Sequence, residues 1–72
     1  METVECISGS MYAERPVALQ WEGERLEIGV ILSQWRTEGE RWFRVKTSDG
    51  RFFELAYNEN GESWRIHPIT GG

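Results

Sequence analysis

Several residue types that carry chemistry in small proteins are scarce in this chain of 72 residues. Cys6 is the only cysteine and His67 is the only histidine. No intrachain disulfide can form, and a structural zinc site, which needs four ligands, is not expected. No apolar run approaches the ~18 residues that a membrane-spanning helix needs. The sequence therefore predicts no metal, no cofactor and no contact with a membrane.

The start of the chain and its single cysteine predict a cytoplasmic protein. The residues Met1–Glu5 provide neither the basic region nor the apolar region of a secretory signal peptide. A lone cysteine fits a reducing compartment. No neighbouring group would activate Cys6, so we expect a small buried hydrophobe or an exposed thiol rather than a nucleophile.

Catalytic motifs are missing as well. The phosphate-binding patterns GxxxxGK and GxGxxG do not occur. His67 precedes Pro68, and we expect a partly exposed strand histidine there rather than a general base. The formal net charge of -4 argues against strong nonspecific DNA binding, which depends on phosphate contacts. These features predict that the protein is not an enzyme.

Aromatic residues, in contrast, are plentiful: four Trp, two Tyr and three Phe. Between regularly spaced glycines lie runs rich in Val, Ile, Phe, Tyr and Trp, which favour strands. We predict an N-terminal arm over 1–14, with a short strand near Val4–Ile7, followed by one β domain over 15–70. The domain is expected to be a five-stranded antiparallel meander that forms a small open barrel, similar in size to SH3-type barrels. The predicted strands are 16–21, 25–36, 41–47, 51–58 and 63–69.

Three turns predict how these strands pair. Asn60-Gly61 is typical of a two-residue hairpin loop. Ser48-Asp49-Gly50 suits a three-residue loop with glycine in the left-handed region, and Gly23-Glu24 suits a two-residue II′ loop. All three registers place apolar residues opposite one another and put Arg44 opposite Glu54 on the other face. The predicted apolar pairs are Tyr57–Trp64, Leu55–Ile66, Val45–Phe53, Phe43–Leu55, Trp21–Leu26, Leu19–Ile28 and Val17–Val30.

The segment 25–36 has two interpretations. Ile28, Ile31, Leu32 and Trp35 fit the spacing of an amphipathic helix. Gly29 and the β-branched residues around it favour a strand instead. This strand either bends at Gly29 through a bulge or is long enough to face the core at both ends. We take the strand as the prediction. The expected core is Val17, Leu19, Trp21, Leu26, Ile28, Val30, Phe43, Val45, Phe53, Leu55, Tyr57, Trp64 and Ile66.

The sheet face opposite this core is the candidate binding face. Aromatic residues beside Arg and Lys are typical of protein interfaces and also of surfaces that bind single-stranded nucleic acid. A solvated face, or one hidden in a homodimer, is the alternative. The acid excess favours a protein partner over weak nucleic-acid binding. The candidate residues are Trp42, Arg44, Lys46, Phe52, Arg65 and His67, with Trp35 near the turn at 36–40.

The stretch from Arg15 to Ile66, about 52 of the 72 residues, also carries a resemblance to a known family. Its motifs are Arg15-Pro16-Val17, Trp21-Glu22-Gly23, Ile31-Leu32-Ser33-Gln34-Trp35-Arg36, Trp42-Phe43-Arg44-Val45, Asp49-Gly50, Phe53-Glu54-Leu55 and Trp64-Arg65-Ile66. The chain resembles an uncharacterised small domain of actinobacteria and related bacteria. That domain occurs alone or behind the polymerase-like (Y-family) subunit of the translesion mutasome. The resemblance implies an accessory or docking module linked to DNA damage tolerance, without catalysis.

Overall fold

The computed structural model describes residues 4–6 and 15–70, and all regular elements in them are β-strands. They form one antiparallel sheet in the order β1-β2-β3-β4-β5-β6. The all-β prediction is confirmed, and the segment 25–36 is strand, not helix. The sixth strand is the short one expected near Val4–Ile7. The strands are β1 (Val4–Cys6), β2 (Pro16–Trp21), β3 (Glu24–Thr37), β4 (Glu40–Thr47), β5 (Phe52–Asn58) and β6 (Ser63–Ile69).

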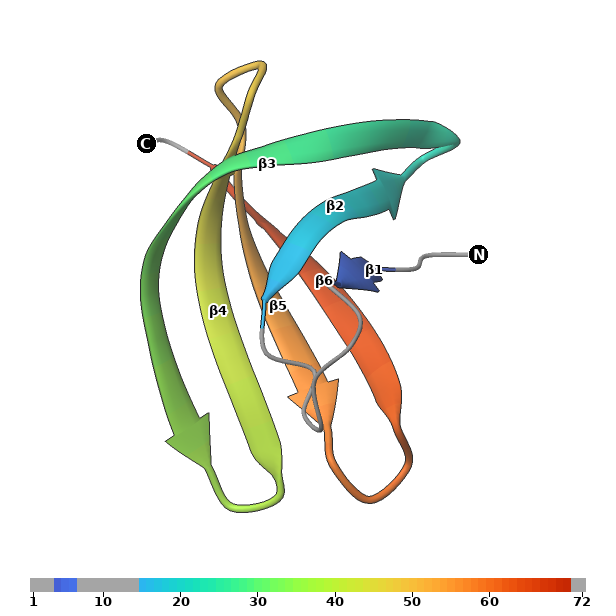
Figure 1. Cartoon of the computed structure of the whole chain (residues 1–72), viewed down its shortest axis with the longest axis vertical. Coiled ribbons are helices and arrows are strands. Elements are labelled where there is room, and N and C mark those ends of the chain that lie inside the picture. Colours follow the sequence, from blue (N-terminus) through green and yellow to red (C-terminus); the bar gives the residue numbers. More distant parts are fainter. Residues whose placement is uncertain (1–3, 7–14, 71–72) are drawn as a thin grey trace.

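The sheet is curled into a half-barrel by β3, its longest strand (Figure 1). β3 arches over the molecule, so that β1 and β2 lie across the inner side of β4, β5 and β6. The first part of β3 pairs with β2, and the part from Ile28 to Thr37 pairs with β4. The described residues contain no helix that could span a membrane.

Two bulges interrupt the pairing of β3 with β4. One lies between Ile28 and Val30 and the other between Ile31 and Ser33. The first confirms the bulge at Gly29, one of the two alternatives for this strand; the second was not predicted. Each bulge adds one residue to β3, so the side chains that follow change faces. Val30 therefore lies opposite Lys46 and is 45% exposed, and its prediction as a core residue is wrong.

The hairpin between β2 and β3 has a different register from the predicted one. Its two-residue loop is Glu22–Gly23, with φ of 50° and 83°, instead of Gly23–Glu24. Positive φ at both positions is the signature of a type I′ turn. Leu19 consequently pairs with Leu26. The shift is two residues, which leaves each side chain on its predicted face. The predicted pairs Trp21–Leu26, Leu19–Ile28 and Val17–Val30 are therefore wrong.

The hairpin between β4 and β5 is as predicted. Residues 48–50 form its three-residue loop, and Gly50 has a φ of 93°. A side chain rarely adopts this left-handed conformation, which explains glycine at the third loop position. The predicted pairs Val45–Phe53, Phe43–Leu55 and Arg44–Glu54 are all present.

The hairpin between β5 and β6 has the predicted pairs but a longer loop. Tyr57 pairs with Trp64 and Leu55 with Ile66. The loop spans the four residues 59–62 rather than the two residues Asn60-Gly61. The Asn58 side-chain oxygen accepts hydrogen bonds from the backbone N–H groups of residues 60 and 61, both at 2.9 Å. An asparagine that satisfies loop donors in this way stabilises the wider turn.

The core lies between the inner faces of the two halves of the sheet. Its buried members are Leu19, Leu26, Phe43, Val45, Phe53, Leu55 and Ile66, with Val4, Trp21, Ile28, Ile31 and Trp64 packed against them. Most of the predicted core is therefore confirmed. Val17 and Tyr57 are only partly buried and lie outside this cluster. Ala18 and Ala56 are fully buried without having been predicted.

Two leucines provide a matched test of this fold. Leu55 is buried, whereas Leu32 is 48% exposed at the second bulge. Leu55→Ala should cost about 2–5 kcal/mol, because it removes buried methyl groups and leaves a cavity. A domain this small has only ~3–5 kcal/mol of net stability, so much of the variant should be unfolded. Leu32→Ala should change stability by about 0.5 kcal/mol or less. Urea unfolding measures both, and equal losses would contradict the position of Leu32.

A polar cluster closes the hairpin between β4 and β5. Thr47 is 2% exposed; its hydroxyl donates to the Asp49 carboxylate and accepts from the Arg51 backbone N–H at 3.1 Å. The Arg51 guanidinium pairs with Asp49 at 2.6 Å and with Glu24 at 2.9 Å. Hydrogen bonds from Arg51 and then from Thr47 lower the pKa of Asp49 to about 2. The cluster thereby ties this hairpin to the start of β3.

The lowered pKa of Asp49 predicts a pH-dependent contribution to stability. The folded pKa lies below the unfolded one, so the contribution is complete above about pH 4 and is lost as the pH falls toward 2. Asp49→Asn should therefore lower the urea midpoint near pH 7, and the gap from wild type should narrow below about pH 4. A gap that stays constant down to about pH 2.5 would show that Asp49 does not titrate as described.

Candidate binding face

The seven predicted site residues all lie on one side of the sheet, opposite the core. Residues 42, 44 and 46 of β4 pair in register with 56, 54 and 52 of β5, and residues 65 and 67 of β6 pair with 56 and 54. On β3, Trp35 pairs with Trp42. We call this side the outer face; the seven residues are Trp35, Trp42, Arg44, Lys46, Phe52, Arg65 and His67.

Three parallel rings cross the outer face from β3 to β6. The ring centroids of Trp35 and Trp42 are 5.8 Å apart with an angle of 9° between the planes. Those of Trp42 and His67 are 6.0 Å apart with an angle of 18°. Trp42 also donates a hydrogen bond from Nε1 to the Thr37 hydroxyl at 3.0 Å, which fixes its indole. We call Trp35, Trp42 and His67 the ring ladder.

Ala56 on β5 makes room for the ring ladder. It pairs with Trp42 on one side and Arg65 on the other. Although it belongs to the outer face, it is 1% exposed, so larger neighbours cover it. A methyl group at this position leaves the space in which Trp42 of β4 and His67 of β6 meet across β5. A planar ligand that stacks on Trp42 must displace one of the two flanking rings.

Both arginines of the outer face combine an aromatic contact with an ion pair. The Arg44 guanidinium lies 5.8 Å from the Trp35 ring and pairs with Glu54 at 2.6 Å. Arg65 lies 6.0 Å from the central tryptophan of the ladder and pairs with Glu40 at 2.6 Å. Each guanidinium is therefore held against an indole by a carboxylate, which limits its motion.

Lys46 differs from these arginines. Its ammonium group lies 5.5 Å from the Phe52 ring, and it makes no ion pair with any residue in 4–6 or 15–70. The two arginines of the face are each compensated by one carboxylate. The outer face therefore carries mixed charge with a small positive excess and is not a contiguous basic patch.

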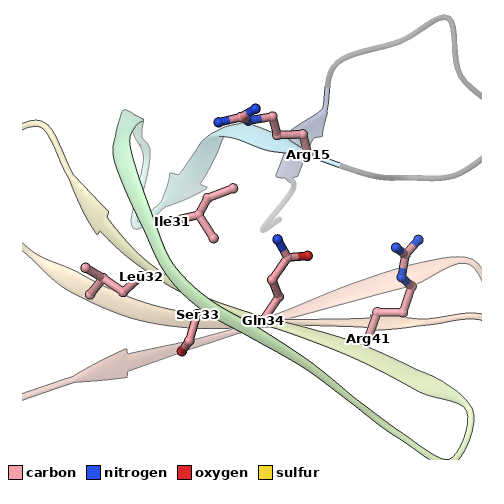
Figure 2. A pocket seen from close by; sticks show the side chains of 6 residues that line it. All are labelled: Arg15, Ile31, Leu32, Ser33, Gln34 and Arg41. Carbon is pink, nitrogen blue, oxygen red and sulfur yellow. The ribbon is translucent and has the colours of Figure 1, made fainter.

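A second candidate site, which the sequence did not predict, lies on the other side of the sheet. It is a pocket of about 550 Å³ between the start of β2 and the pair β3–β4 (Figure 2). The side chains of Gln34 and Arg41 point from β3 and β4 toward the side on which Arg15 lies. No motif marks it, because its residues come together only when β3 curls. The lining residues are Arg15, Ile31, Leu32, Ser33, Gln34 and Arg41.

Comparison with known proteins adds no relative from which a function could be transferred. No family model matches the chain, and no curated protein or solved structure matches it. The resemblance to the mutasome-linked domain therefore rests on the motifs alone. The geometry of the two candidate sites carries the functional argument.

The space at Ala56 provides a test of the ring ladder. Ala56→Leu should push Trp42 and His67 apart and cost about 1–3 kcal/mol, because a larger side chain does not fit the covered position. Closely stacked indoles couple in the far-ultraviolet circular dichroism spectrum, and Trp35→Ala should abolish that signal. Ala56→Leu should weaken it, whereas the smaller change Ala56→Ser should preserve it. An unchanged signal in Trp35→Ala would show that the two indoles are not stacked.

Proposed function

We propose that this protein is a non-enzymatic docking module that binds a protein partner through its outer face. The observation that carries the proposal is the ring ladder with two arginines held against it. Tryptophan and arginine dominate the energetics of protein interfaces. Trp35 is 36% exposed, so an indole edge is available to a partner. Rings that are already ordered lose little conformational entropy when a partner binds.

The charges of the outer face favour a protein over nucleic acid as the partner. Glu54 and Glu40 neutralise the two arginines, and the whole chain has a formal net charge of -4. Phosphate contacts dominate affinity for nucleic acid and require uncompensated cations. Trp42 also lies between two rings, which hinders base stacking on it.

Weak binding of single-stranded nucleic acid is the second candidate function. Lys46 beside Phe52, without an ion pair to a described residue, favours it. In such a pair, the uncompensated cation binds a phosphate group and the aromatic ring stacks on the neighbouring base. This candidate needs only the β4–β5 part of the outer face.

The resemblance supplies the cellular setting of the proposal. A stand-alone copy of a domain that elsewhere follows the polymerase-like subunit of the mutasome would serve DNA damage tolerance. It would do so in the bacterial cytoplasm, as an accessory that docks on another protein. The first candidate partner is the polymerase-like subunit encoded in the same genome.

Trp35→Ala tests the docking proposal. The change removes an exposed indole and should leave the fold intact, while it weakens binding of the partner by a factor of ten or more. The measurement is biolayer interferometry with the purified polymerase-like subunit, with Trp42→Ala as a second variant. Arg36→Ala, next to Trp35 but outside the ring ladder, is the control and should bind like wild type. Absence of binding by wild type would remove the damage-tolerance setting.

The alternatives are separated by two further measurements. Titration with a short single-stranded oligonucleotide should leave tryptophan fluorescence unchanged at low salt; quenching that weakens as salt rises would establish the nucleic-acid function instead. Sedimentation equilibrium should show a monomer. A dimer that Trp35→Ala dissociates would mean that the outer face binds a second copy of the chain.

A further inference from the structure

We infer that the pocket between the start of β2 and the pair β3–β4 binds a small ligand with a phosphate or carboxylate group. Its volume of about 550 Å³ lies in the range of small-molecule sites. It faces the inner side of the sheet, away from the outer face. The inference goes beyond the docking function and does not depend on it.

The charge of the pocket points to an anion. Arg15 precedes β2 and Arg41 lies on β4, and none of the described residues that line the space is acidic. Two guanidinium groups at one cavity are unusual in a chain of net charge -4. The planar fork of arginine matches the oxygen atoms of phosphate and carboxylate groups. An oxyanion is therefore the complementary ligand.

Arg15 is available for such a ligand. It makes no hydrogen bond or ion pair with any residue that the structure describes. An Arg side chain without a partner keeps all five donors for a ligand. Five other arginines are each held by a carboxylate within the chain: Arg25, Arg36, Arg44, Arg51 and Arg65.

The second bulge of β3 shapes the neutral part of the pocket. Ile31 pairs with Val45 and Gln34 pairs with Phe43, so both lie on the side of the core residues. Strict alternation would send Gln34 to the side opposite Ile31, and the extra residue at Leu32 reverses this. Figure 2 shows Ile31, Gln34 and Arg41 on the side of the sheet that faces Arg15. The ligand would thus meet an apolar surface and an amide beside the two guanidinium groups.

A small ligand fits this place better than an added strand. β2 pairs with β3 only from Glu24 to Glu27, so the described chain provides no partner strand along this edge beyond Glu27. Bulges at Gly29 and Leu32 disrupt the regular hydrogen bonding that a new strand would need. The edge of β3 beyond Glu27 therefore borders the pocket and is not a place where another strand docks.

Titration of the ¹⁵N-labelled protein by NMR tests the inference. The probes are inorganic phosphate, a nucleoside monophosphate and succinate, each at constant ionic strength. At least one should produce saturable shifts at the amides of Ile31, Gln34 and Arg41. If phosphate and the nucleotide saturate the shifts but succinate does not, the ligand carries a phosphate group. If only succinate saturates them, the ligand carries a carboxylate group.

Two variants and a matched control complete the experiment. Arg15→Gln, in an exposed position, should keep the fold and weaken binding at least tenfold, and Arg41→Gln should do the same. Arg36→Gln removes an equal charge outside the pocket and should bind like wild type. Shifts that do not saturate with any probe, or affinities that Arg15→Gln leaves unchanged, would overturn the inference.

Discussion

The pairing of β3 with two different neighbours controls the whole structure. Its first residues pair with β2 and its later residues with β4, so the strand must bend between them. The bulge at Gly29 allows the bend, and β2 then lies across the inner side of β4–β6 (Figure 1). Leu19 of β2 thereby meets Phe43, Phe53 and Leu55 in the core. With a straight β3, the apolar face of β2 and that of β4–β6 would both stay in contact with water. This exposure costs roughly 25 cal/mol for each Å² of apolar surface.

The second bulge of β3 determines which of its residues belong to each of the two candidate sites. The extra residue at Leu32 reverses the faces of all later side chains in the strand. Trp35 consequently stacks on Trp42 on the outer face, while Gln34 turns to the inner pocket. Without this bulge, the indole of Trp35 would occupy the inner side and the ring ladder would lose its first ring. One inserted residue thus separates the ring ladder on the outer face from the pocket that Arg15 and Arg41 line.

The four tryptophans divide between stability and surface. Trp21 and Trp64 pack against the core through Phe53 and Phe43, with ring centroids 5.7 Å and 5.9 Å apart. Trp35 and Trp42 lie on the opposite face, where they add nothing to the enclosed core. Aromatic rings that gather into one contiguous patch at the surface are typical of an interaction site. That contrast is the physical basis of the docking proposal.

The all-β class and the pairing from β4 to β6 could be predicted from the residues alone, because short loops fix the register of adjacent strands. Gly50 and the alternation of residues 41–57 were sufficient for the pairs of β4 with β5. This alternation and the β5–β6 register together placed six of the seven outer-face residues. The β2–β3 register, the bulge at Leu32 and the position of Trp35 depend on how the strands pack in the folded protein. Type I′ and II′ loops compete at Gly23, and an inserted residue leaves no local signal. The pocket could not be predicted, because Arg15 and Arg41 line the same space only after β3 has curled around the core.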